Sequence, residues 1–174
     1  MTLPGDLRAR PARASDGAAI SALMRACDET YLAWAPRGWA PPAPAPAWTI
    51  RLQDGLRWSR VAVDGTGRVV ALVSFTPARV GDAPDGPAGE RLPGVAHVGA
   101  LYVHPARWRE RIGTALLARA EAAMAADGYY RARLWTPVGA PAERFYRAAG
   151  WAPDGRRGLN PWLGLEVVGY AKAL

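Results

Sequence analysis

The fold is decided by Leu101-Tyr-Val-His-Pro-Ala-Arg-Trp-Arg-Glu-Arg-Ile-Gly-Thr-Ala-Leu-Leu117. The pattern predicts a buried strand, an arginine-rich turn and a helix that begins at Ile112. A turn leading into a helix exposes unpaired backbone N–H groups at the positive end of the helix dipole, and such a site binds phosphate. Arg107, Arg109 and Arg111 add positive charge to this turn. The stretch therefore predicts a site for a phosphorylated small molecule.

Hydrophobic periodicity and turn residues place the other elements on both sides of this stretch. Strands are predicted at Leu7–Arg10, Arg60–Val63, Val69–Phe75, Val95–Val103, Arg131–Trp135 and Leu165–Ala173. Helices are predicted from Ser15 or Asp16 to about Tyr31, and over Trp48–Leu56, Ile112–Ala126 and Pro141–Ala149. The order β-α-α-β-β-β-α-β-α-β predicts an α/β (α+β) fold, a mixed sheet with helices on its faces.

Two segments contain too much proline for regular structure. Ala35–Ala47 is rich in proline and alanine, and Pro77–Pro93 is predicted to be a surface loop. Asp64–Gly67 has the composition of a hairpin turn between two strands. Because no internal repeat or interdomain linker occurs, residues 1–174 are predicted to form a single domain.

The composition narrows the classes of function. The net charge is +7, and residues 101–174 hold 11 Lys and Arg against 6 Asp and Glu, but no basic run or nucleic-acid motif accompanies it. The one cysteine, Cys27, lies on an apolar helical face and fits a reducing compartment. No signal peptide and no apolar run of about 20 residues is evident. We expect a cytoplasmic protein that binds no metal, nucleic acid or membrane.

Three motifs together resemble the GNAT-type N-acetyltransferase superfamily, whose members use acetyl-coenzyme A. Leu101–Pro105 resembles the strand that lies along the pantetheine arm. Arg109–Thr114 resembles the pyrophosphate loop, written Q/R-x-x-G-x-G/A. Ala142–Trp151 resembles the helix and turn that carry the tyrosine on the thiol side. The resemblance implies a GNAT-like acyl-CoA N-acyltransferase fold over 1–174, with a mostly antiparallel central sheet.

The resemblance also implies which residues bind acetyl-CoA: Leu101, Tyr102, Val103, Trp108, Arg109, Glu110, Arg111, Ile112, Gly113, Thr114, Gly139 and Tyr146. This chain departs from the family pattern at three of them. Trp108 stands where glutamine or arginine is typical, Arg111 replaces the first glycine of the loop, and Gly139 replaces an asparagine. A side chain at position 111 either crowds the pyrophosphate or contacts a phosphate itself.

Acetyl transfer needs a donor for the oxyanion and a proton for the leaving thiolate. The resemblance places a strand N–H near Leu101–Val103 against the thioester oxygen, which requires this strand to part from its neighbour. Gly99 suits a bulge at that point, although it also suits close packing. Tyr146 is the expected catalytic acid, because neighbouring helical residues point about 100° apart and Phe145 is the natural core member.

The catalytic base is expected on the central strand, where many members of the family carry a glutamate and this chain has His97. Histidine titrates near pH 6.5 and can accept a proton directly or through water. The alternatives are a strand histidine that pairs with a neighbour, or a base at Asp28 or Glu29 near the end of the first helix. His104, beside a proline, is expected to be structural.

The acceptor is expected to be a primary amine of a small molecule or peptide, bound by the segment from Tyr31 to Trp48. Its aromatic residues Tyr31, Trp34 and Trp39 suit a cationic or aromatic amine, and Glu29 can pair with a positive charge. These aromatic side chains can equally anchor a structureless loop.

Two further functions stay open at this stage. A non-catalytic acetyl-CoA sensor would retain the fold, and binding of nucleic acid would predict steep salt dependence. The final strand of such folds can also pair across a homodimer.

Overall fold

The computed structural model describes residues 3–43, 52, 58–81 and 89–174. Its strands are β1 (Arg8–Pro11), β2 (Trp58–Val63), β3 (Val69–Arg79), β4 (Arg91–Val103), β5 (Arg131–Pro137), β6 (Ala152–Asn160) and β7 (Leu165–Ala173). Its helices are α1 (Gly17–Glu29), α3 (Ile112–Ala126), α4 (Pro141–Ala148) and three short 3-10 helices, Ala14–Asp16, Thr30–Ala33 and Pro105–Arg107. The helix predicted over Trp48–Leu56 lies outside the described residues, apart from Leu52.

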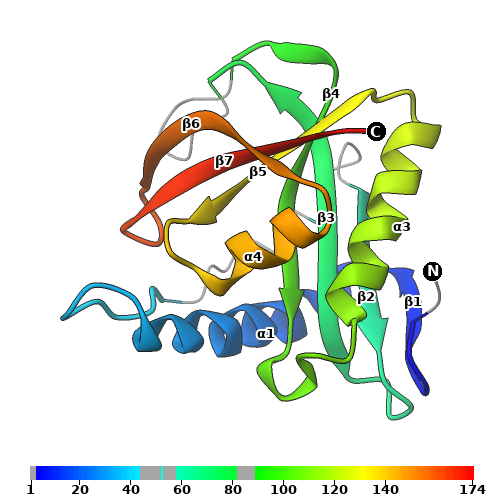
Figure 1. The fold of residues 1–174 in the computed structure, drawn as a ribbon. Coiled ribbons are helices and arrows are strands. Elements are labelled where there is room, and N and C mark those ends of the chain that lie inside the picture. The colour runs from blue at the N-terminus through cyan, green and yellow to red at the C-terminus, as the bar shows by residue number, and fades with distance from the viewer. Residues whose placement is uncertain (1–2, 44–51, 53–57, 82–88) are drawn as a thin grey trace.

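The described strands form one sheet in the order β1-β2-β3-β4-β5-β7-β6 (Figure 1). β4 and β5 are parallel, and every other neighbouring pair is antiparallel. The prediction of a mixed, mostly antiparallel sheet is therefore confirmed. β7 lies between β5 and β6, so both of its edges are already paired. The final strand is thus an inner strand of the sheet, and β6 is the edge strand next to it.

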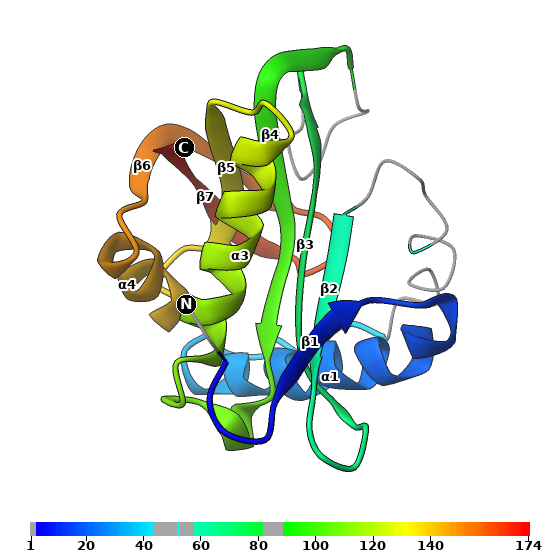
Figure 2. The ribbon, with the colours of Figure 1, turned by 90° about the vertical axis from the view of Figure 1, so that its right-hand side faces the viewer.

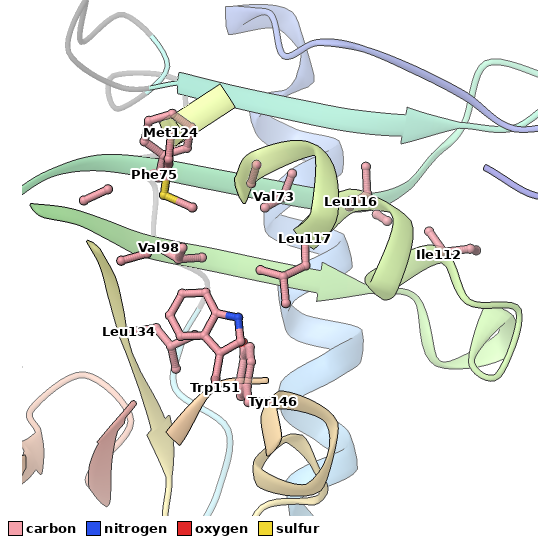
Figure 3. Close-up of a cluster of buried hydrophobic side chains, with 14 of the residues drawn as sticks. Val73, Phe75, Val98, Ile112, Leu116, Leu117, Met124, Leu134, Tyr146 and Trp151 are labelled. Atoms are coloured by element: carbon pink, nitrogen blue, oxygen red, sulfur yellow. The ribbon is translucent and has the colours of Figure 1, made fainter. Parts of the chain in front are cut away.

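Helices cover both faces of the sheet. α3 and α4 lie on one face, and α1 runs behind the strands on the other (Figures 2 and 3). The apolar stripe predicted for α3 is confirmed, because its members are all at most 1 % exposed: Ile112, Leu116, Leu117, Ala120 and Met124. Burying a large aliphatic side chain contributes about 1.5–3 kcal/mol, so this stripe fixes α3 across β3 and β4. No helix among the described residues is long and apolar enough to cross a membrane.

Two hydrophobic clusters result from this arrangement. The larger lies between the sheet and the helices α3 and α4 (Figure 3), and includes Val73, Phe75, Val98, Leu134, Tyr146 and Trp151. The smaller lies between the sheet and α1, and includes Ile20, Leu23, Met24, Cys27, Val61 and Leu72. Cys27 is thus a buried core residue, as predicted.

The hairpin of β2 and β3 is confirmed. The Asp64 carboxylate accepts hydrogen bonds from the backbone N–H groups of Thr66 (3.0 Å) and Arg68 (3.1 Å) and so holds the turn. The surface loop predicted at Pro77–Pro93 is wrong at both ends, because β3 continues to Arg79 and β4 begins at Arg91. The ladder between them is irregular around Pro77, where a missing backbone N–H is tolerated.

β6 has no counterpart among the predicted strands. Its sequence, Ala-Pro-Asp-Gly-Arg-Arg-Gly-Leu-Asn, contains proline, two glycines and a single large apolar residue, so it lacks the alternation typical of a strand. It is an edge strand paired only with β7. Edge strands tolerate proline because one side of the backbone is free.

Candidate active site

The central feature of the site is a split between the two parallel strands. β4 pairs with β5 only from Val95 to Val98. Beyond this point β4 stays with β3, while β5 continues to Pro137 along β7. The register with β3 shifts at the same place, so that Gly99 is the extra residue between Val98 and Ala100. The bulge predicted at Gly99 is confirmed, and it marks the vertex of the split.

The split leaves backbone groups of β4 without a strand partner. The N–H of His104 donates to the Val70 carbonyl oxygen at 2.9 Å. Because hydrogen-bonding direction alternates along an antiparallel pair, Leu101 and Val103 face away from β3 and into the split. The Val103 carbonyl oxygen accepts from the Trp108 indole N–H at 2.8 Å. The N–H group of Leu101 is therefore available as a donor beside the vertex.

A cavity of about 600 Å³ fills the split. One end is lined by the arginine-rich turn and the start of α3, and the middle by Gly99–Val103 and α4. The other end lies on the side of α1 and the β6–β7 turn. Most of the predicted site residues line this cavity along its length: His97, Leu101, Tyr102, Val103, Trp108, Arg109, Arg111, Ile112, Gly113, Thr114, Tyr146, Tyr31 and Trp34.

The turn before α3 has the backbone of an anion-binding nest. Arg109 (φ +68°) and Arg111 (φ +60°) are left-handed, the only non-glycine residues of the described chain with positive φ. The first hydrogen bond of α3 runs from the Ala115 N–H to the Arg111 carbonyl oxygen at 3.0 Å, so the amides before Ala115 have no partner within the helix. Left-handed residues beside helical ones turn successive N–H groups toward one point, where an anion binds. Arg111 thus keeps the conformation of the expected glycine.

Side chains around this turn have different roles. The Arg107 guanidinium contacts both carboxylate oxygens of Glu110 at 2.8 Å and Asp6 at 3.4 Å. Glu110, predicted to bind the cofactor, does not line the cavity, because Arg107 holds its carboxylate. Arg109 and Arg111 are exposed, line the cavity and form no ion pair among the described residues. These two arginines are free to meet phosphate oxygens.

Tyr146 lies at the middle of the cavity and is only 7 % exposed. Its ring lies beside that of Trp151 (Figure 3), at a centroid distance of 6.1 Å. It also packs against the ring of Phe145, at 5.3 Å. Burial raises the pKa of its hydroxyl far above the ordinary value, so the group keeps its proton. Tyr146 faces the cavity as expected, but the expectation that Phe145 is the core member of the pair is wrong. Tyr146 is the more buried of the two, and both side chains line the cavity.

The far end of the cavity has an aromatic wall. Tyr31 and Trp34, which were predicted, lie with ring centroids 4.8 Å apart. Trp135 of β5 and Asn160 at the end of β6 also line this end and were not predicted. Asn160 precedes a proline in a turn-like segment, which was the available signal. His97 is half-buried on β4 and is placed opposite Thr76 and Arg133 in the strand register.

Besides Glu110, three further predicted residues lie away from the cavity wall. Glu29 is exposed and pairs with Arg25 at 2.9 Å. Gly139 donates its N–H to Glu143 at 2.8 Å. The Trp39 indole N–H donates to the Leu163 carbonyl oxygen at 2.7 Å, so this ring supports the wall from behind.

Asp28 is a buried carboxyl group next to the aromatic wall. It is 2 % exposed, and its Oδ1 atom has no hydrogen-bond partner in the described chain. Burial raises its pKa from 3.8 to about 7. Its charge raises the pKa of Tyr31 and Tyr102 further, which places it behind these two cavity residues. Asp28 itself does not line the cavity.

Comparison with known proteins agrees with this geometry. A model described as the acetyltransferase (GNAT) family matches residues 21–151, and the chain therefore belongs to this family of N-acetyltransferase enzymes, which use acetyl-CoA. No curated protein matches the chain.

Solved structures share the fold. The PaiA N-acetyltransferase from Thermoplasma acidophilum, in complex with coenzyme A, has a TM-score of 0.70 at 15 % identity and covers 98 % of this chain and 100 % of its own. An N-acetyltransferase from Staphylococcus aureus Mu50 has a TM-score of 0.70 at 16 % identity, over 97 % and 99 % of the two chains. A GNAT acetyltransferase from Brucella melitensis, in complex with acetyl-CoA, has a TM-score of 0.62 at 21 % identity, over 97 % and 88 %.

Two substitutions of Arg111 separate the effect of its backbone conformation on stability from the effect of its guanidinium on acetyl-CoA binding. We expect Arg111→Gly to raise the free energy of unfolding by about 1 kcal/mol, since a left-handed conformation costs a residue with a Cβ about that much. Arg111→Ala keeps the Cβ and serves as the matched control, with no such gain. Both variants lose the guanidinium and should bind acetyl-CoA more weakly by a similar factor. Urea unfolding and calorimetric titration measure the two effects, and equal stability of the two variants would contradict the backbone argument.

Proposed function

We propose that this protein transfers an acetyl group directly from acetyl-CoA to a primary amine of a small molecule or peptide. One observation carries the proposal: a single cavity joins an anion-binding nest, a free strand N–H and a buried, protonated Tyr146. This order of groups matches the order of phosphate, amide arm and reactive end in the proposed donor.

The residues present fit acetyl-CoA. The nest at Arg109–Thr114 offers backbone N–H groups and two free guanidinium groups to a diphosphate. Leu101 and Val103 present strand backbone to an arm that contains amides. When bound, acetyl-CoA supplies the acetyl group as an activated thioester.

For each step of the acetyl transfer, one group in the cavity stabilises charge or moves a proton. Leu101 donates its N–H to the carbonyl oxygen as negative charge develops there, and this stabilises the transition state. Tyr146 gives its hydroxyl proton to the sulfur as the carbon–sulfur bond breaks. His97 takes one proton from the amine nitrogen, which forms the new bond to the acetyl carbon. Cys27 serves no covalent step, because burial keeps its thiol protonated.

The role of His97 predicts a specific pH dependence. Histidine ordinarily titrates near pH 6.5 and accepts a proton only above its pKa. We expect kcat/KM of the parent protein to fall on the acidic side, and His97→Ala to lower activity at neutral pH and flatten this acidic limb. The chain's other histidine, His104, uses Nδ1 to accept the Ala106 N–H at 3.2 Å, so His104→Ala is the control. An unaltered acidic limb in His97→Ala would rule out this base.

The proposal is tested by thiol release from acetyl-CoA over a panel of amines, with acetyl-CoA binding measured separately. Acceptor-dependent thiol release supports it. Tight acetyl-CoA binding with only slow, acceptor-independent hydrolysis would overturn it in favour of a sensor.

A further inference from the structure

The acceptor end of the cavity offers hydrogen-bond donors and aromatic rings, and no carboxylate among the described residues. Among the described residues that line the cavity there is no Asp or Glu. Glu29 is engaged with Arg25, and Asp28 lies behind the wall. A second ammonium group on an acceptor would therefore find no carboxylate among the described lining residues, which favours the aromatic over the cationic amine of the two acceptors expected from sequence.

Two arginines lie next to this end of the cavity. Arg133 is opposite His97 in the β4–β5 register, and its guanidinium donates to the Arg79 carbonyl oxygen. The Arg156 guanidinium lies 4.4 Å from the ring centre of Trp135. Space for Arg156 exists because position 169 is glycine, where a Cβ would come within 2.8 Å of the Arg156 Cβ. Arg156 is paired with Asp154 at 2.7 Å, so these groups of β5 and β6 add no excess negative charge beside the wall, which suits a carboxylate or carbonyl oxygen.

Asn160 presents a fixed hydrogen-bond donor at the same end. Its Oδ1 atom accepts the backbone N–H groups of Trp162 (3.0 Å) and Leu163 (2.9 Å). Because the side-chain amide is planar, its Nδ2 atom points away from this turn, and Nδ2 makes no hydrogen bond to any described residue. The turn is held by the Trp39 indole and by the bond from the Gly164 N–H to the Asn160 carbonyl oxygen at 2.7 Å. Asn160 is therefore a preorganised donor on the cavity wall.

We propose that the acceptor is an α-amino acyl compound with an aromatic or large apolar side chain, in which a carboxylate or peptide carbonyl lies one carbon from the reacting amine. Asn160 Nδ2 donates to this oxygen, and Tyr31, Trp34 and Trp135 contact the side chain. The inference rests on the proposed acetyl transfer. An α-amino group at a peptide end has a pKa of about 8, against about 10.4 for a lysine amine, so less work is left to a histidine base.

Three amines with the same ring test the inference: phenylalanine, phenylalaninamide and phenethylamine, which carry a carboxylate, a carbonyl and neither group. With kcat/KM calculated on the concentration of unprotonated amine, we expect it to be about 10-fold or more higher for the first or second than for phenethylamine, since a bond to a charged or carbonyl oxygen has that effect. A preference for phenylalanine indicates free amino acids, and one for the amide indicates peptide N-termini. Equal or faster acetylation of phenethylamine would overturn the inference.

Asn160→Asp is the matched variant, because it keeps the Oδ1 acceptor for the turn and replaces the Nδ2 donor with a carboxylate oxygen, which cannot donate and repels an anionic acceptor group. We expect an unchanged melting temperature, a loss of about 10-fold or more in kcat/KM for phenylalanine, and little change for phenethylamine. A uniform loss over all three amines would contradict the assignment of Asn160.

Binding without turnover separates this inference from the proposed function. Titration of the protein with each amine, followed by tryptophan fluorescence, reports occupancy of the wall that holds Trp34 and Trp135. If no amine releases thiol but phenylalanine binds in a manner sensitive to Asn160→Asp, the ligand class stands and acetyl transfer fails. If thiol is released but neither rate nor binding distinguishes the three amines, the ligand class fails.

Discussion

Replacing Tyr146 by phenylalanine is expected to lower kcat by about 100-fold or more, the usual range for loss of a general acid. The Tyr146 hydroxyl makes no hydrogen bond to another described residue, and its high pKa keeps it protonated across the physiological range. Removing the hydroxyl therefore leaves the departing thiolate without a proton donor. Steady-state thiol release with a saturating acceptor measures this effect.

Affinity for acetyl-CoA should be unchanged in Tyr146→Phe, because the ring remains packed against Phe145 and Trp151. The free energy of unfolding should change little, since no hydrogen bond is lost. Tyr170→Phe is the matched control. Tyr170 is fully buried in the same cluster and donates to Glu143 at 2.7 Å, but it does not line the cavity.

The control should lose about 1 kcal/mol of stability, a typical value for a hydrogen bond, and keep its turnover. If Tyr146→Phe turns over as fast as the parent protein, the hydroxyl is not the acid. If both variants lose turnover equally, the effect is one of packing and the assignment also fails.

Local signals predicted the cofactor half of this site. The bounds of α3 follow from an apolar stripe between the turn at Arg111 and Gly128, and the structure gives the same residues, 112–126. The bulge at Gly99 followed from the family resemblance, which requires this strand to leave its neighbour. What the sequence did not show is that Arg109 and Arg111 adopt a left-handed backbone. Only the surrounding fold holds a residue with a Cβ in this conformation.

The acceptor half depends on segments that are distant in the sequence. Trp135 and Asn160 meet because β5, β7 and β6 are neighbours in that order, and the sequence lacks the alternation that would have revealed β6. The relative burial of Phe145 and Tyr146 was predicted wrongly for a related reason. The period of α4 shows that Phe145 and Tyr146 point apart, but which of them is buried depends on Trp151 and Tyr170.

Asp28→Asn is expected to change the pH dependence of stability more than any other substitution near the site. The pKa of this carboxyl is about 7 in the folded protein against an ordinary value of 3.8, so the folded state holds a proton that the unfolded chain has lost. A raised folded pKa gives stability that is present below pH 4 and lost as the pH rises to about 7. About three pKa units at 1.36 kcal/mol each set an upper limit of about 4 kcal/mol for this loss.

Urea unfolding of the parent protein and of Asp28→Asn between pH 4 and 8 measures the effect. The parent should lose stability over this range, and the variant, which has no ionisable group there, should show a flatter profile and be the more stable at pH 8. Asp16→Asn is the opposite control at the other end of α1. Its carboxylate pairs with Arg10 at 2.7 Å, which lowers its pKa, so it contributes stability that is lost as the pH falls. Parallel profiles of the parent and Asp28→Asn would contradict the prediction.

The Asp28→Asn variant also tests whether the catalytic base is His97 or Asp28. Asp28 is surrounded by Arg25 and Cys27 on α1, Tyr31 beyond it and Tyr102 on β4. Because its side chain is behind the cavity wall, we expect Asp28→Asn to retain kcat/KM and its acidic limb while it gains stability. If the acidic limb of the kcat/KM profile is flattened in Asp28→Asn and intact in His97→Ala, the catalytic base is Asp28 and not His97. A buried carboxyl without partners would then be retained at the expense of stability because the reaction uses its proton affinity.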